Sequence, residues 1–278
     1  MKRTRSNLWL FALIALTAVS FAVSLLATRP IVDAVRDLNL DADSRKTWLN
    51  LASIGSFCVL LSLLALFSTS LLVGGRRTFD FLGLTRSGFG GVDLMACAIG
   101  CTFLAYVGFF LRGQFFGEPS GHLRAWDQVL GAGAGGWGLQ VALLATLAVG
   151  PAFAEEIVFR GLLFRGLLTR LPAAIALPFV ALAFAASHED LQHIVAVIPM
   201  AIWLTLLAWR SGSLWPSILA HLVNNLVAGA LGAIGAASSG HISGWVHALA
   251  WTVAFPCFVI GVRVMLRRPS TDSREEPK

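Results

Sequence analysis

The sequence predicts an all-α protein, a polytopic bundle of about eight transmembrane helices with both termini on the cytoplasmic side. Of its 278 residues, 56% are hydrophobic and only 13% are charged, whereas a soluble domain has about 25% charged residues. The mean hydropathy is +0.75. The apolar residues also form uninterrupted runs of roughly 20, the length that a helix needs to cross a bilayer. A chain this apolar needs lipid as its solvent.

Eight such runs follow one another along the chain. They cover Leu8–Ala27, Leu49–Val73, Val92–Leu111, Trp137–Phe159, Pro172–Ser187, Ile194–Trp209, Pro216–Ala236 and Trp245–Met265. The first run is longer than the roughly 7 to 15 apolar residues of a signal peptide, so we expect a retained anchor. Eight spans predict one transmembrane domain over residues 1–268, and residues 269–278 are expected to form a disordered cytoplasmic tail.

The segments between the spans have the composition of loops. The polar stretch Thr28–Trp48 is typical of an external loop with a short surface helix. The inner segment Gly74–Gly91 combines arginines with phenylalanines and leucines, so we expect it to lie along the membrane interface. The glycine-rich stretch Gly131–Gly136 follows no predicted strand, so it lacks the context of a phosphate-binding loop and is expected to be a flexible external loop.

The four cysteines, Cys58, Cys97, Cys101 and Cys257, all fall within predicted spans. None has the spacing of a metal site such as C-x2-C. We therefore expect them to pack as small apolar residues.

The net charge of +6 does not predict nucleic-acid binding, because the basic residues lie at helix ends rather than on one amphipathic face. They instead orient the protein in the membrane. With the N-terminus inside, only six of the 21 Lys and Arg residues fall in outer segments, namely Arg29, Arg36, Arg45, Lys46, Arg112 and Arg124. The positive-inside rule therefore predicts that both termini are cytoplasmic.

Ionisable residues inside spans are expensive and thus mark functional sites by default. Glu156 and Arg160 are four residues apart with the acid first, the favourable order for an ion pair on a helix. Glu155 is rotated by about 100° from Glu156. We expect the arginine to hold one carboxylate while the other points into the bundle as a base. In the alternative interpretation, both glutamates merely mark the inner end of the span.

His188 is predicted to reach the level of Glu155. The two lie on successive spans joined by a hairpin whose tip is near Arg170 and Pro172. At 1.5 Å per residue, Glu155 is about 23 Å and His188 about 26 Å from that tip. Their side chains can therefore meet, although a lone histidine is more often a hydrogen-bonded core or loop residue.

His221 and Asn225 share a helix face because they are four residues apart, whereas Asn224 is offset from that face. An imidazole beside a carboxamide supplies donors for a developing oxyanion. The alternative is that both make ordinary hydrogen bonds between membrane helices.

The segment from His188 to His193 resembles a zincin motif only superficially. That motif needs H-E-x-x-H, and here one extra residue separates the two histidines. On a helix, His193 would point about 140° away from His188. We therefore expect His193 and Asp190 to be turn residues or to lie behind the site.

Together these residues resemble the CPBP family of intramembrane proteases, which includes the CAAX prenyl endopeptidases and bacteriocin-processing or immunity proteins. The family's first motif, E-E-x-x-x-R, matches Glu155, Glu156 and Arg160. Its second motif, F-x-x-x-H, matches Phe184 and His188, and its third, H-x-x-x-N/D, matches His221 and Asn225. The order of the motifs agrees as well, and Leu82-Gly83-Leu84 is weakly family-like. The three motifs cover roughly a quarter of the chain.

The resemblance implies that Glu155 and His188 activate a water for peptide-bond hydrolysis, while His221 and Asn225 stabilise the oxyanion. Glu156 and Arg160 would then be structural supports. The family has been described both as metal-dependent and as glutamate-dependent. A divalent metal such as zinc is therefore an open possibility, with Glu155, His188 and His221 as its ligands.

The resemblance also implies that the partners are membrane lipids and a membrane-associated protein or peptide substrate, and not nucleic acid. It implies a location in a bacterial inner membrane. Prenylated CAAX proteins, peptide pheromones, bacteriocins and anti-sigma factors all remain open as substrates. The alternative function is a non-catalytic membrane protein of the same fold that acts as an immunity factor or scaffold. The absence of a clear internal repeat disfavours a transporter.

Overall fold

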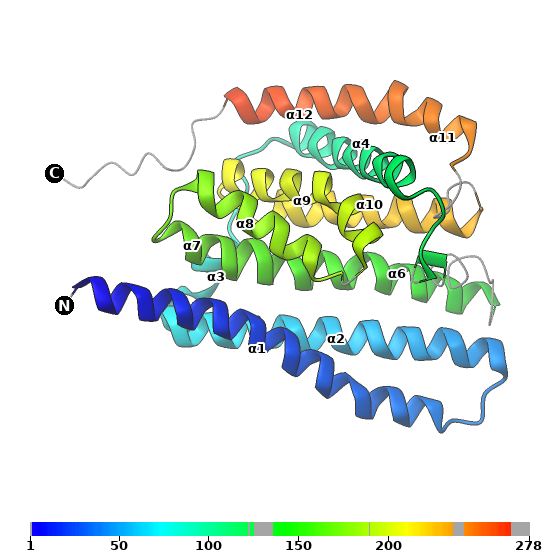
Figure 1. The fold of residues 1–278 in the computed structure, drawn as a ribbon, viewed down its shortest axis with the longest axis horizontal. Coiled ribbons are helices and arrows are strands. Elements are labelled where there is room, and N and C mark those ends of the chain that lie inside the picture. The colour runs from blue at the N-terminus through cyan, green and yellow to red at the C-terminus, as the bar shows by residue number, and fades with distance from the viewer. Residues whose placement is uncertain (1, 122, 125–135, 189, 236–241, 268–278) are drawn as a thin grey trace.

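The fold is an all-α bundle, as the sequence predicts (Figure 1). The computed structural model describes residues 2–121, 123–124, 136–188, 190–235 and 242–267. Seven helices in these ranges are long and apolar enough to cross a membrane: Phe11–Arg36, Ser44–Val73, Gly91–Phe116, Gly138–Leu168, Leu191–Ser211, Trp215–Ala233 and Gly244–Arg267. The polytopic membrane architecture is thereby confirmed.

The fifth predicted span is shorter than the others. It corresponds to α8 (Ala173–Ala186), a helix of 14 residues, whereas crossing a bilayer takes about 20. Figure 1 shows the turn between α8 and α9 (Leu191–Ser211) partway along the bundle, while α6 (Gly136–Glu155) and α10 (Trp215–Ala233) extend farther. Seven of the eight predicted spans are thus long enough to cross a membrane. The eighth, α8, is short, and His188 follows its end within the bundle.

The first two helices are longer than predicted. α1 (Lys2–Arg36) continues through Pro30, and α2 (Ala42–Val73) begins where the side chain of Asp41 accepts a hydrogen bond from the Ser44 amide at 2.9 Å. The expected external loop from 28 to 48 is therefore wrong in extent, because most of it forms the ends of two helices. Spans bounded by apolar residues end too early, because the residues at these helix ends are polar although they are helical.

The helices form three tiers, which Figure 1 shows stacked from bottom to top. α1 and α2 form an antiparallel pair that packs against α6. The middle tier contains α6, α8, α9 and α10. The third tier contains α4 (Gly91–Phe116) and α12 (Phe255–Arg267), where α4 packs against α9, α10 and α12. α1 begins and α12 ends at the same end of the bundle.

Shorter elements complete the chain. Between α2 and α4 lie η1 (Gly75–Arg77) and α3 (Thr78–Leu82). The helix that begins as α6 continues through the π-helix η2 (Glu156–Phe164) and α7 (Arg165–Leu168), and α12 is preceded without a break by α11 (Gly244–Leu249) and the π-helix η3 (Ala250–Ala254). The segment after α3 docks onto the bundle: the Gly83 carbonyl accepts from the Leu214 amide at 2.8 Å. Leu82 is fully buried and Phe79 is 60% exposed, so the predicted interfacial segment is anchored in the protein on one side.

The interior is mostly apolar, but large apolar side chains also cover much of the exterior, unlike in a soluble protein. Arg160 is among the largest fully buried side chains, whereas Val92, Leu266 and Phe115 are among the most exposed apolar ones. Lipid is the solvent in which such a distribution is stable, because outward apolar side chains meet acyl chains and polar groups need internal partners. Cys58, Cys97 and Cys101 are buried and Cys257 is partly buried, all as free thiols, which confirms their predicted packing role.

The glycine-rich stretch 131–136, except Gly136, and the tail 269–278 lie outside the described residues.

Candidate active site

The two adjacent glutamates lie where α6 passes into the π-helix η2, and they have different surroundings. Glu156 is fully buried and pairs with Arg160, whose Nη1 donates to its Oε1 at 2.8 Å. The side chain of Glu155 is 19% exposed and lines a cavity. The predicted division, with one carboxylate held by the arginine and the other pointing into the bundle, is confirmed. π-helical turns are rare and are frequently found at functional sites.

Every polar end of the Arg160 guanidinium has a partner. Besides Glu156, its Nη2 donates to the Ala201 carbonyl at 3.0 Å and its Nε donates to Thr205 Oγ1 at 3.3 Å. The guanidinium carbon also lies 4.3 Å from the centre of the Phe184 ring. A buried charge is stable only with such pairing, so Arg160 holds η2, α8 and α9 together.

His221 lies between the two glutamates. Its Nδ1 is 3.0 Å from Glu156 Oε1, and its Nε2 is 3.9 Å from Glu155 Oε2. Glu156 is ionised against Arg160 and a carboxylate only accepts, so Nδ1 of His221 must carry a proton. The ring can then donate from Nε2 only as the doubly protonated imidazolium. His221 is 3% exposed, so its contacts with the two glutamates are shielded from solvent.

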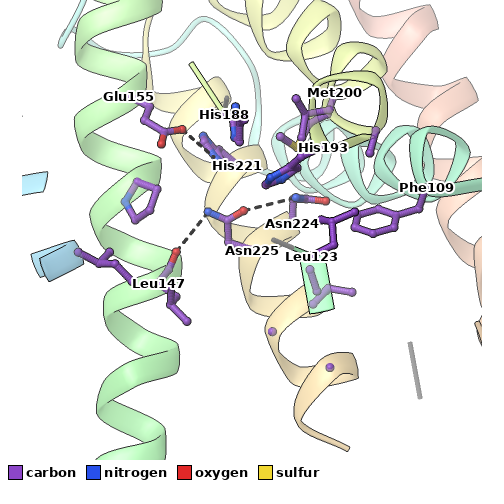
Figure 2. A pocket seen from close by; sticks show the side chains of 18 of the residues that line it. Phe109, Leu123, Leu147, Glu155, His188, His193, Met200, His221, Asn224 and Asn225 are labelled. Atoms are coloured by element: carbon purple, nitrogen blue, oxygen red, sulfur yellow. Dashed lines mark hydrogen bonds and ion pairs between the residues drawn. The ribbon is translucent and has the colours of Figure 1, made fainter. Parts of the chain in front are cut away.

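His188 reaches the same cavity from the turn after α8. Its Nδ1 is 3.1 Å from the Phe184 carbonyl. A carbonyl only accepts, so Nδ1 donates, and in the neutral ring the lone pair belongs to Nε2. Figure 2 shows Glu155, His188 and His221 close together. Glu155 and His188 both line this cavity, and no hydrogen bond joins them among the described residues. That their side chains meet at one level stays a prediction.

Phe184 connects the three motif segments. Its ring packs edge-on against His188 at 5.1 Å and against His221 at 5.9 Å, measured between ring centres. It also lies under the Arg160 guanidinium and is fully buried. The phenylalanine of the second motif is therefore the surface on which both histidines are oriented.

The expectation that His193 points away from His188 is wrong. The ring centres lie 4.5 Å apart at 70°, and both rings line the cavity. The physical reason is that the two histidines do not share one helix: α8 ends at Ala186, and α9 begins at Leu191, where Asp190 caps it by accepting from the His193 amide at 2.9 Å. Asp190 is thus a turn residue, as predicted, and Glu189 lies outside the described residues.

Asn225 faces the cavity one turn after His221, as its spacing predicts. Asn224, expected to be offset, also lines the cavity, and its Nδ2 donates to Asn225 Oδ1 at 3.4 Å. Asn225 Nδ2 in turn donates to the Leu147 carbonyl on α6, also at 3.4 Å. Figure 2 shows this chain of two hydrogen bonds below the histidines.

The cavity has a volume of about 630 Å³, within the usual range of ligand sites. It is bounded by apolar side chains of α1, α2, α4 and α9, including Phe21, Phe57 and Phe109. Its ionisable and amide groups come mainly from α6, the α8–α9 turn and α10. A mostly apolar cavity with a few convergent polar groups suits a membrane-embedded substrate.

The possible ligands of a metal are Glu155, His188 and His221. Within the described ranges, no group of three or more His, Cys, Asp or Glu residues is arranged to hold a metal ion. Glu155 Oε2 and His221 Nε2 lie 3.9 Å apart. The bond between His188 Nδ1 and a carbonyl leaves the lone pair on Nε2, as in metal-binding histidines. Metal binding by these three residues therefore stays an open alternative.

Sequence reasoning missed the supports of the site. Thr205 and Ala201 on α9 hold Arg160, and the Leu147 carbonyl holds Asn225. None of these belongs to a motif. The available signal was Pro151 within the fourth span, since a proline in a helix leaves a carbonyl without its usual donor.

The comparisons agree with the motifs. No curated protein and no solved structure matches the chain. Residues 122–227 match the family model described as type II CAAX prenyl endopeptidase Rce1-like, and this segment contains all seven motif residues. The family indicates a hydrolase of the protease class embedded in a membrane. The resemblance to the CPBP intramembrane proteases, of CAAX prenyl endopeptidase type, is thus confirmed over residues 122–227 of this multi-pass membrane protein.

Proposed function

We propose that the protein is an intramembrane endopeptidase that hydrolyses a peptide bond of a membrane-associated protein or peptide. The observation that carries this proposal is the convergence of Glu155, His188, His221 and Asn225 on one apolar cavity between membrane helices. Peptide hydrolysis needs a base for the water and donors for the oxyanion, and these four residues offer both.

Glu155 is the base. It is the carboxylate that Arg160 leaves available, and its oxygens face the cavity. His188 assists through Nε2, because its Nδ1 is committed to the Phe184 carbonyl. A water between Glu155 and His188 gives its proton to the carboxylate as its oxygen attacks the scissile carbonyl carbon. The carboxylic acid then donates that proton to the leaving amine, so the base is regenerated.

His221 and Asn225 stabilise the charge on the carbonyl oxygen. His221 acts as an imidazolium through Nε2–H, held by Glu156 at Nδ1. Asn225 contributes its neutral amide from the next turn of α10. Fixed donors inside an apolar cavity act more strongly than the same donors in water. Glu156 and Arg160 support this arrangement and take no part in proton transfer.

A chelator distinguishes activation of the water by Glu155 from activation by a bound metal. On the proposed mechanism, dialysis of the purified protein against a strong chelator leaves peptide cleavage unchanged. Loss of activity on dialysis, followed by recovery with zinc, would assign Glu155, His188 and His221 to metal ligation instead.

A scaffold or immunity factor of the same fold is the other candidate, and the buried Glu156–Arg160 pair does not favour it, because helix packing alone gives no reason to bury such charges.

The experiment compares membrane proteomes of cells that produce the wild-type protein or Glu155→Ala. Accumulation of an uncleaved membrane protein only in the variant supports the protease and identifies its substrate, whether prenylated or not. Identical proteomes would contradict the proposal.

A further inference from the structure

Pro151 lies inside α6, one turn before Glu155, and changes the hydrogen bonding of that helix. In an α-helix the amide of each residue donates to the carbonyl four residues earlier. Residue 151 has no amide hydrogen, so the Leu147 carbonyl lacks its helical donor. That carbonyl faces the cavity, and the donor that it receives is Asn225 Nδ2 at 3.4 Å.

The other end of the Asn225 carboxamide is also held. Asn224 Nδ2 donates to Asn225 Oδ1 at 3.4 Å. The two hydrogen bonds fix which end of the amide is which, because a carbonyl can accept only from the nitrogen end. Asn224 is 8% exposed and lines the same cavity, so its side chain is itself confined.

A carboxamide nitrogen has two hydrogens. With one of them on the Leu147 carbonyl, the second is left for another acceptor. Glu155 and Leu147 lie on α6, and His221 and Asn225 lie on α10. Among the contacts between these helices, that of Glu155 with His221 and that of Leu147 with Asn225 involve residues that line the cavity. The second contact depends on the missing amide hydrogen of Pro151.

We propose that Pro151 and Asn224 are positioning residues that hold the Asn225 carboxamide ready to donate its second N–H to the substrate oxyanion. This inference rests on the proposed function, because it explains how one of the oxyanion donors is oriented. Donors held in place before the reaction need no reorganisation when charge develops. In Pro151→Ala, the new amide competes for the Leu147 carbonyl and releases Asn225.

The test is a pair of double-mutant cycles on the full chain, purified and placed in lipid vesicles. The first cycle measures kcat and KM on an internally quenched, vesicle-anchored peptide that the wild type cleaves. Pro151→Ala is expected to lower kcat about tenfold, less than the hundredfold or more for losing an oxyanion donor outright. KM should stay within about twofold of the wild-type value, since the substitution does not alter the contacts that bind the substrate in its ground state. In an Asn225→Ala background, Pro151→Ala should have no further effect.

The second cycle measures thermal unfolding and needs no protease activity. Pro151→Ala alone should maintain or raise the unfolding temperature, because α6 gains a backbone hydrogen bond. Asn225→Ala should lower that temperature by about 2–4 °C in the wild-type background and by less in the Pro151→Ala background. If Pro151 had only a structural role, Pro151→Ala would not lower turnover while keeping or raising the unfolding temperature.

Pro178→Ala is the matched control, since Pro178 is an exposed proline inside α8; it should leave kcat unchanged. Asn224→Ala releases the other end of the carboxamide, and it should lower kcat at unchanged KM without adding to Asn225→Ala. An unchanged kcat in both Pro151→Ala and Asn224→Ala, or additivity in either cycle, overturns the inference. If the wild type cleaves no peptide, the proposed function fails separately, and the unfolding cycle alone decides whether Pro151 controls Asn225.

Discussion

At the scale of single residues, the site depends on giving two neighbouring carboxylates opposite tasks. Glu156 is fully buried and is bonded to both Arg160 and His221. Glu155 keeps partial exposure to the cavity, and its Oε2 lies 3.9 Å from Nε2 of His221. In the proposed mechanism, one carboxylate therefore holds the proton on Nδ1 of the histidine, while its neighbour accepts a proton from water.

Arg160→Ala is expected to reduce the amount of folded protein as well as its activity. The substitution leaves Glu156 as a buried charge without its cation, and breaking one side of such a pair costs about 3–5 kcal/mol. Folded yield after membrane extraction and thermal unfolding measure the effect. The double variant Glu156→Gln with Arg160→Gln should recover more folded protein than either single change. Equal damage in all three variants would argue against the pair.

The pairing of Glu156 with Arg160 follows from their spacing, so it was predictable from sequence alone. The position of His193 was not. α8 ends at Ala186 and a new helix begins at Leu191, capped by Asp190, so His193 turns toward His188. A count of residues along one assumed helix gives the opposite direction. Residue spacing predicts direction only where the backbone between two residues is regular.

At the scale of elements, close approach of α4 to α9 stabilises the helix that holds Arg160. A Cβ atom at Gly108 on α4 would overlap the carbonyl of Ala196 on α9. Small residues allow such approach between membrane helices. The Trp203 indole on α9 also donates to the Cys97 carbonyl of α4 at 3.1 Å. Ala201 and Thr205 are thereby fixed relative to the third tier.

Gly108→Ala is expected to destabilise the protein by about 1–3 kcal/mol, because the two helices must separate to admit the new methyl group. Gly113→Ala, five residues farther along α4, is the matched control. A Cβ there meets nothing within 4 Å, so the change should be neutral or gain up to about 1 kcal/mol of helix propensity. Unfolding measurements on both variants test this. Equal stability of the two variants would contradict the close approach.

The helices themselves were predictable because apolar runs of about 20 residues are an unambiguous signal. The π-helix η2 was not, since nothing in residues 156–164 distinguishes a wide turn from an α-helical one. The ends of α1 and α2 were also missed, because a hydropathy count stops at polar residues even where the helix continues. The short α8 reads as a span by composition, and only its length of 14 residues separates it from the others.

At the scale of the whole molecule, the bundle has an apolar core and an apolar exterior, and its polar motif residues gather at one cavity. The motif residues come from segments between 155 and 225, and the tier of α1 and α2 supplies apolar walls of the cavity. The three motifs predicted the centre of the site. The walls come from helices without any motif, so only the folded structure reveals them.

Both termini are predicted to be cytoplasmic. The distribution of Lys and Arg favours this orientation, and α1 begins at the end of the bundle where α12 finishes. A reporter active only outside the inner membrane should give no signal when it is fused after Lys278. The same reporter fused after Leu40, between α1 and α2, is the positive control. Strong activity at Lys278 would contradict the orientation.

The most direct test of the central claim is the turnover of Glu155→Gln on a peptide in vesicles. The substitution keeps the shape of the side chain and removes the base. We predict a loss of at least about a hundredfold in turnover, in line with general-base contributions, with an unchanged unfolding temperature. Glu118→Gln is the matched control, because that side chain is 93% exposed, and it should retain wild-type turnover. Full activity of purified Glu155→Gln would contradict the proposed mechanism.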